Sequence, residues 1–240
     1  NLRRARDGEP LMCPQLDFGQ VGAEQADWVR LLECGTLAPE GQGSLCPPAS
    51  WMFQREWTER VRVSADCHEK QLHLAAIALA DGRLRDAGEA VAAALALRVP
   101  PTALFLRAQV ERLNGDDRAA ADSALEAHRL LPGDVSLARQ AFAMALRAGM
   151  NDRVVAAYEA SPAAVQADGR TAMTYAFALL RQGDTDRAEA VLMRDGGLSV
   201  TDIREGEISL TNLYLDIARA RADAAGRAFD PAETDVPRRF

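Results

Sequence analysis

The chain has 240 residues, of which 48% are hydrophobic and 26% are charged, and its formal net charge is -7 at pH 7. These values are ordinary for a globular protein, and the negative charge disfavours nucleic-acid binding that depends on overall charge. No apolar run approaches the roughly 20 residues that a membrane-spanning helix needs, so we expect no membrane span. Arginine supplies almost all of the basic residues and alanine is abundant, which is typical of a bacterial protein from a GC-rich genome.

The first 65 residues differ in composition from the rest of the chain. They hold all three tryptophans and turn-forming stretches such as APEGQGSLCPPAS at 38–50, and their proline and glycine clusters argue against long helices. We expect an irregular or partly β region over residues 1–65, and one interpretation is the end of a preceding domain. The segment WMFQREWTERVRV at 51–63 is compatible with a strand or with a short helix. The chain starts at Asn1 without an initiator methionine, which suggests a piece of a longer protein.

The cysteines all lie within the first 67 residues, at Cys13, Cys34, Cys46 and Cys67. No CxxC pair is present, which argues against a zinc ribbon. We expect reduced or buried thiols, an interpretation that favours a cytoplasmic location; two disulfides in an exported protein are the alternative. Neither the compartment nor the oligomeric state follows from the sequence.

Glycine recurs at a nearly constant step in the middle of the chain. The separations are 33, 34 and 34 residues between Gly82, Gly115, Gly149 and Gly183, and each glycine stands between two helix-forming segments. Such a period is typical of stacked helical hairpins. A glycine after the first helix supplies the left-handed backbone that ends the helix and reverses the chain. An Asp or Asn just beyond it can cap the second helix.

The pattern predicts four hairpins over residues 66–196, each made of a helix A and a helix B. The predicted A helices are 69–80, 102–113, 136–147 and 170–181. The predicted B helices are 84–97, 117–130, 152–160 and 185–193. Prolines follow the B helices of the first three hairpins, where a proline ends a helix at or before the preceding residue.

The repeat resembles the tetratricopeptide repeat (TPR) family, which implies a mostly α fold with a right-handed α-solenoid of about four helical hairpins. Five residues after the turn glycine that family has a small residue, because helices A and B cross closely there. The chain has Ala87, Ala120, Val154 and Ala188 at this position. Seven residues before the glycine, where the family has Gly or Ala, stand Ala75, Ala108, Phe142 and Ala176. The third hairpin departs at both positions, so we expect a looser or shifted crossing there.

Residues 197–240 complete the chain with a predicted capping helix and an extended tail. Leu210, Leu213, Tyr214 and Ile217 share one face of an amphipathic helix over 207–225. We expect this helix to cover the apolar end of the repeats by packing on helix B of the fourth hairpin. Asp202 and Glu205 have the spacing of a capping box before it.

A narrower resemblance rests on the segment REGEISLTNLY at 204–214. It is similar to the C-terminal part of uncharacterised bacterial proteins in which a large β-rich, sugar-processing-like domain precedes a TPR-type tail. Tyr214 stands where those proteins have Trp. The resemblance implies that the chain is the accessory helical domain of a larger bacterial carbohydrate-active protein.

No catalytic or cofactor-binding motif is present. The sequence lacks P-loop, GxGxxG, HExxH, nucleophile-elbow and EF-hand patterns, so we expect no catalytic residue, no metal site, no cofactor and no enzyme activity. The acidic residues beside two turns, at Asp116–Asp117 and Asp184–Asp186, are interpreted as helix caps.

The resemblance to TPR proteins also implies a binding surface, because one face of the A helices lines the inner, concave surface in that family. Arginine forms forked hydrogen bonds with carboxylates, so an acidic peptide or a protein is the expected partner. Alternatively, the arginines on this face of the A helices are solvated, or they pair with the chain's own acids or with the acidic segment 230–235. The first functional hypothesis is therefore a non-catalytic scaffold, and the alternative is the accessory domain described above. The predicted peptide-binding residues are Phe105, Gln109, Arg112, Arg139, Arg147, Arg170, Phe177 and Arg181.

Overall fold

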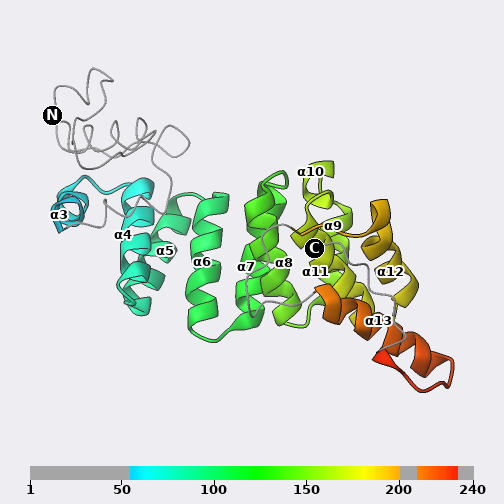
Figure 1. The fold of residues 1–240 in the computed structure, drawn as a ribbon. Helices are drawn as coiled ribbons and strands as arrows, with labels where there is room; N and C mark the ends of the chain where they lie inside the picture. Colours follow the sequence, from blue (N-terminus) through cyan, green and yellow to red (C-terminus); the bar gives the residue numbers. More distant parts are fainter. Residues whose placement is uncertain (1–54, 201–209, 232–240) are drawn as a thin grey trace, which may run out of the picture. The chain divides into compact units, whose positions relative to one another are not determined.

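The computed structural model describes residues 55–200 and 210–231, and every regular element within these ranges is a helix (Figure 1). The mostly α fold is therefore confirmed for the described residues. The chain divides into two compact units, the first ending at Gly115 and the second beginning at Asp116. The second predicted hairpin is divided between the two units.

The first unit contains four described helices. They are α3 (Arg55–Val63), α4 (His68–Ala80), α5 (Leu84–Leu97) and α6 (Pro101–Leu113). Helix α4 packs against α3, α5 and α6, and α5 also packs against α6. One hydrophobic cluster joins α4, α5 and α6, with Leu72, Val91 and Leu106 among its buried members. The alternative left open for 51–63 is thereby resolved, because residues 55–63 form a helix.

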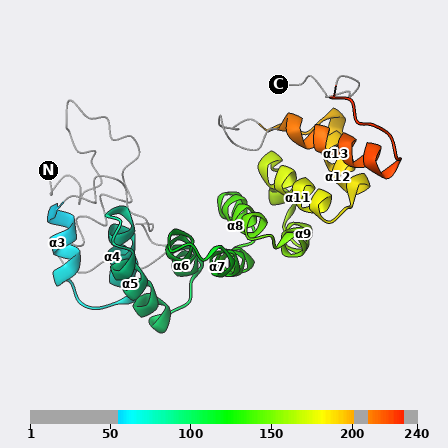
Figure 2. The same cartoon turned by 90° about the horizontal axis from the view of Figure 1, so that it is seen from below.

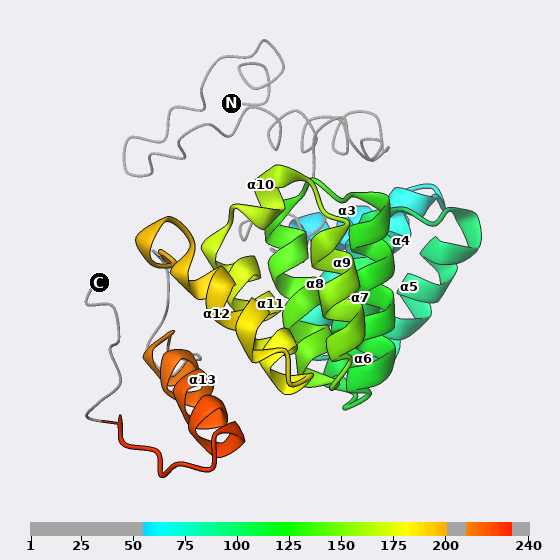
Figure 3. The ribbon, with the colours of Figure 1, turned by 90° about the vertical axis from the view of Figure 1, so that its right-hand side faces the viewer.

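The second unit contains the remaining helices. They are α7 (Asp117–Leu130), α8 (Val135–Arg147), α9 (Asn151–Glu159), α10 (Ala163–Gln166), α11 (Gly169–Arg181), α12 (Thr185–Met193), the 3-10 helix η2 (Arg194–Gly196) and α13 (Leu210–Ala224). Helix α8 contacts α7, α9 and α11, and α11 also contacts α9 and α12. Figure 3 shows α7, α8 and α9 side by side. Each hairpin therefore contributes a helix that packs on the next hairpin.

All four turn glycines have a left-handed backbone. Their φ angles are 73° at Gly82, 85° at Gly115, 73° at Gly149 and 82° at Gly183. A Cβ atom added at any of these positions would meet no heavy atom within 4 Å. The backbone conformation alone therefore requires glycine, since other residues pay a steric penalty at positive φ. The predicted turns are confirmed.

The small residues predicted at the helix crossings are buried. Ala87, Ala120 and Ala188 are fully inaccessible, as is Val154 at the corresponding position of the third hairpin. The residues seven positions before the turn glycines are also fully inaccessible; they are Ala75, Ala108, Phe142 and Ala176. In the first and fourth hairpins, small side chains at these positions let the backbones of α4 and α5, and of α11 and α12, approach closely.

The third hairpin packs differently, as the two departures predicted. Helices α9 and α12 have the same length of 9 residues, but the contact of α9 with α8 is less extensive than that of α12 with α11. Phe142 fills the space instead, because its ring packs edge-on against His128, with centroids 5.1 Å apart, and against Tyr158. The short helix α10 then occupies part of the length that helix B has in the first two hairpins.

Aspartates cap several helices. Asp116 accepts a hydrogen bond from the backbone N–H of Ala119, and Asp184 accepts one from that of Arg187, so these two predicted caps are confirmed. Asp134 caps α8 in the same way. The third B helix lacks such an Asp or Asn cap, because α9 begins at Asn151 and the preceding Met150 makes no side-chain cap.

The last helix covers the end of the fourth hairpin. Helix α13 packs on α12 and α11 (Figure 2), and it spans Leu210–Ala224 within the predicted 207–225. The Tyr214 hydroxyl donates a hydrogen bond of 2.9 Å to the Leu192 carbonyl, and Leu213 is fully buried. The predicted contact with helix B of the fourth hairpin is confirmed, whereas the predicted capping box at Asp202 lies outside the described residues.

Two further predictions concern the cysteine thiols and the membrane-spanning potential of the helices. Cys67 has a free thiol and precedes α4, where its sulfur accepts a hydrogen bond from the Lys70 backbone N–H; the other cysteines lie outside the described residues. In the ranges 55–200 and 210–231, none of the helices combines the length and apolar character that crossing a membrane requires.

Candidate functional site

The eight residues predicted to bind a peptide divide between the two units. Phe105, Gln109 and Arg112 lie on α6 in the first unit, and all three are partly buried. The other five lie on α8 and α11 in the second unit, and these two helices contact each other. We call the surface formed by Arg139, Arg147, Arg170, Phe177 and Arg181 the arginine face.

Arg139 lies at one end of the arginine face and is held by a carboxylate of the neighbouring helix. Its Nε atom lies 3.2 Å and 3.1 Å from the two Asp168 oxygens, and its Nη2 atom also pairs with Oδ1. Asp168 at the same time accepts a hydrogen bond of 3.0 Å from the backbone N–H of Thr171. Arg139 therefore fixes the start of α11 relative to α8.

Two further arginines lie at the opposite end of the face. Arg147 closes α8 and forms an ion pair with Asp117 at 3.1 Å. Arg181 closes α11 and donates a hydrogen bond of 3.0 Å to the Leu146 carbonyl. Because Arg139 meets the start of α11 while Leu146 meets its end, α8 and α11 run in the same direction. The arginines consequently gather at both ends of the two helices.

The middle of the arginine face is less polar. Phe177 is 9% exposed, so its ring belongs to the packed interior and leaves little surface for a ligand. Arg170 is partly buried at the start of α11, and Ala143 on α8 is exposed. An extended ligand on this face would therefore cross small side chains between charged ends.

The two units differ in how they use their predicted arginines. On α6, Arg112 donates to the side-chain oxygen of Gln109, at 3.1 Å and 3.3 Å, so its bond is to a neutral amide. On the arginine face, Arg181 likewise bonds a neutral carbonyl, whereas Arg139 and Arg147 each have a carboxylate. The chain's own acids thus compensate two of the predicted arginines, as the alternative interpretation stated.

Electrostatics favour the ionised form of Asp168. Burial tends to raise the pKa of this carboxyl, but hydrogen bonds from Arg139 and Thr171, together with the Arg139 charge, outweigh it and lower the pKa. An ionised Asp168 keeps both the helix cap and the bond to Arg139. The bond from Arg139 therefore holds the start of α11 against α8.

A second polar cluster, which the sequence did not predict, lies between α9, α11 and α12. The Tyr175 hydroxyl donates to Glu159 at 2.8 Å, and Arg187 contacts both residues. Burial and the bond to Glu159 raise the pKa of Tyr175. The Tyr175 ring stacks on Tyr158, with centroids 4.1 Å apart, so this cluster ties neighbouring helices together.

A repeat spacing in the sequence could have revealed such contacts. Arg153, Arg187 and Arg221 recur at steps of 34 residues, and each reaches an acid on another helix. The pairs are Arg153–Asp122, Arg187–Glu159 and Arg221–Asp186. The arginine at this repeat position thus links α9 to α7, α12 to α9 and α13 to α12.

Other site chemistry is sparse. Within the described part of the chain, no group of three or more His, Cys, Asp or Glu side chains is arranged to hold a metal ion.

Comparison with known proteins adds no family: neither a protein-family model nor a curated protein sequence matches the chain. Over the residues that the structure describes, the fold is mostly α and is built from helical hairpins.

Proposed function

We propose that the protein is a non-catalytic interaction module of the TPR-like solenoid type, which binds a protein or an acidic peptide on the inner face of its A helices. The observation that carries this proposal is the arginine face, where α8 and α11 lie side by side with arginines at both ends. Helical-hairpin repeats commonly present such extended surfaces to partners. In the first unit, Phe105 and Gln109 of α6 stand at the repeat positions of Arg139 and Phe177.

Charge supports an acidic partner. Arg181 donates to a neutral carbonyl, so this hydrogen bond leaves its positive charge without compensation. A carboxylate of a bound peptide would replace water around the guanidinium and form a charge-assisted, bidentate pair. Exposed Arg181 can make that contact without losing a structural ion pair. Arg139 and Arg147 would contribute mainly through the field at the ends of the face.

The experiment is calorimetric titration of the full chain with a capped peptide of alternating Glu and Ala residues. We expect Arg181→Gln to weaken binding by about tenfold, since a charge-assisted hydrogen bond contributes roughly 1.5–3 kcal/mol. Arg153→Gln is the matched control, because Arg153 pairs with Asp122 on helices outside the arginine face. Equal loss in both variants would leave only general electrostatic attraction, and no binding by the wild type would refute the module.

A second candidate is the accessory domain of a larger bacterial carbohydrate-active protein. This candidate rests on the resemblance of residues 204–214, from which Tyr214 departs, and in the structure Tyr214 anchors α13 through its bond to Leu192. An aromatic side chain at position 214 would then anchor the last helix both in this chain and in the resembled proteins. Sequencing the complete gene product tests this candidate: a large β-rich domain before Asn1 supports it, and a second helical array there contradicts it.

A further inference from the structure

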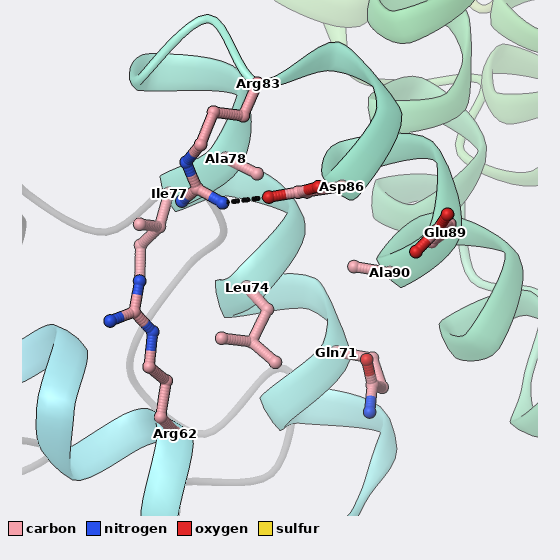
Figure 4. A pocket seen from close by; sticks show the side chains of 9 residues that line it. All are labelled: Arg62, Gln71, Leu74, Ile77, Ala78, Arg83, Asp86, Glu89 and Ala90. Atoms are coloured by element: carbon pink, nitrogen blue, oxygen red, sulfur yellow. Dashed lines mark hydrogen bonds and ion pairs between the residues drawn. The ribbon is translucent and has the colours of Figure 1, made fainter.

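A pocket of about 360 Å³ opens between α3, α4 and α5 in the first unit. Its apolar lining comes from Leu74, Ile77 and Ala78 on α4 and from Ala90 on α5. Figure 4 shows the guanidinium groups of Arg62, from the last turn of α3, and of Arg83, from the α4–α5 turn, on the same side of this lining. The pocket thus combines an apolar floor with a rim that carries both signs of charge, because Asp86 and Glu89 also line it.

The repeat indicates what kind of group belongs on this floor. Leu74, Ile77 and Ala78 stand eight, five and four residues before their turn glycine. The residues at the same offsets in the third and fourth hairpins are Ala141, Met144, Ala145, Tyr175, Ala178 and Leu179, and all six are buried. In the second unit, α8 and α11 are covered by helices of the preceding hairpin, namely α7 on α8 and α9 on α11.

Among the described residues, a smaller part of the chain covers α4, the A helix of the first hairpin. Among the described residues, the one helix before it is the 9-residue α3, which packs on α4, and Leu74 remains partly exposed beside the pocket. By repeat equivalence, the pocket is the place where a further helix would insert an apolar side chain. A volume of about 300–1,000 Å³ is typical of pockets that bind a discrete group.

The charges around the pocket indicate which charge a bound group should carry. Arg83 is paired with Asp81, at 2.9 Å, and with Asp86. Glu89, also on the lining, is paired with Arg85 at 3.0 Å. Arg62 takes part in no ion pair with any residue that the structure describes. Within the described residues Arg83 is neutralised by its carboxylates and Arg62 is not, so a carboxylate is the favoured neighbour for Arg62.

We propose that this pocket binds an amphipathic helix of a partner protein. The helix inserts one apolar side chain between Leu74, Ile77 and Ala90, and it places a carboxylate one turn away against Arg62. The geometry follows from helix periodicity, since residues three or four apart lie on one face. This pocket lies within the first unit and shares no residue with the arginine face.

The test uses the full chain and a defined probe, a capped alanine-rich helical peptide with a Leu and a Glu one turn apart. The peptide is about 15 residues long, because shorter helices are marginal in water. The readout is the isoleucine δ-methyl NMR spectrum, in which Ile77 lines the pocket and Ile217 is buried in α13. Ile217 therefore serves as the internal control for folding and for non-specific effects.

We expect saturable shifts of the Ile77 methyl signal and none of the Ile217 signal. Replacing the peptide Glu by Gln should weaken binding by about tenfold, the usual scale of a lost charge-assisted bond. Arg62→Glu in the protein should abolish binding of the Glu peptide and permit binding of a peptide with Lys at that position. Arg62 is exposed on α3, so this variant should fold, with an unchanged Ile217 signal.

Two outcomes would overturn the proposal. The first is an Ile77 signal that does not respond to the peptide, or responds equally in the Arg62→Glu variant. The second is an Ile77 signal that Arg62→Glu shifts without peptide, together with no binding in trans and a change in the emission of Trp28 and Trp51, measured in a Trp57→Phe background because Trp57 shares α3 with Arg62. That result would identify the chain's own N-terminal residues as the occupant.

Discussion

Arg139 of α8 binds the same carboxylate, Asp168, that caps α11. The Asp168 oxygens accept hydrogen bonds from the Arg139 guanidinium and from the Thr171 backbone N–H, and the Asp168 side chain is only 11% exposed. One carboxylate thus caps the start of α11 and joins α11 to α8. Such shared groups couple the formation of two helices, so the loss of Asp168 should affect both.

The first prediction compares two capping aspartates. Asp116→Ala removes an exposed cap of α7 and should cost about 1 kcal/mol of unfolding free energy, the usual value of such a cap. Asp168→Ala removes a cap and also leaves the partly buried Arg139 guanidinium without its carboxylate, so it should cost about 2–3 kcal/mol. Urea unfolding of both variants measures the difference. Equal losses would show that the bond to Arg139 adds no stability.

The second prediction concerns the helix crossing of the fourth hairpin. Ala188→Leu inserts a larger side chain at a fully inaccessible position of α12 and should cost about 1–3 kcal/mol through overpacking. Ala190→Leu on the same helix is the control, because Ala190 is exposed and the change should be nearly neutral. Thermal unfolding checks both. A destabilised control with an unaffected Ala188 variant would contradict the repeat assignment.

The helices and turns could be predicted because their determinants are local. A positive φ at Gly149 or Gly183 follows from the glycine itself, and the adjacent helix boundaries agree with prediction to within one residue at most ends. The short helix α10 was not predicted. It arises where Pro162 starts a new turn after α9, inside the stretch between the predicted helices 152–160 and 170–181.

The contacts of the candidate site were harder to predict, because they join residues about 30 positions apart. The face that carries Arg139, Arg147 and Arg181 follows from the repeat period, but their partners do not. Asp168 caps α11, and Asp117 lies in the first turn of α7, where the helix dipole also favours an acidic residue. Only the packing of α7, α8 and α11 decides which of these acids meets an arginine.

Gly169 illustrates a long-range constraint that local sequence hides. A Cβ atom at this position would lie 2.1 Å from the Ser199 carbonyl oxygen, so the segment after η2 passes directly over the start of α11. Glycine at the first position of a helix has no local advantage. Its cause is this close approach of another part of the chain, which no spacing in the sequence indicates.

The third prediction concerns α13. Leu213 is fully buried, and Leu213→Ala should cost about 2–5 kcal/mol, as large-to-small changes in packed interiors do. Leu215→Ala, at a partly exposed position of the same helix, should cost clearly less. A chain truncated after Gly197 should lose the cover of Leu192 and aggregate or melt at a lower temperature. An unchanged melting temperature and a monomeric product would show that α13 does not stabilise the fourth hairpin.

The last prediction is a pH dependence of stability that originates at His73. This side chain is buried in α4, and burial lowers its pKa to about 4, although the charge of Glu69 opposes the shift. The unfolded chain binds the proton near pH 6.5 and the folded chain only near pH 4. The contribution to stability is therefore complete above pH 6.5 and is lost progressively as the pH falls toward 4.

The size of this effect follows from the linkage between proton binding and unfolding. Between pH 7 and pH 4.5, His73 should account for a loss of roughly 2–3 kcal/mol in unfolding free energy. His73→Leu cannot bind a proton, so its stability should fall by that much less over the same range. Urea unfolding at the two pH values measures it. His128, whose pKa burial also lowers against the opposing charge of Asp134, still titrates in the His73→Leu variant, so a residual slope is expected. If the variant and the wild type lose equal stability, His73 is not protonated on unfolding in this range, and the assigned burial of its imidazole is wrong.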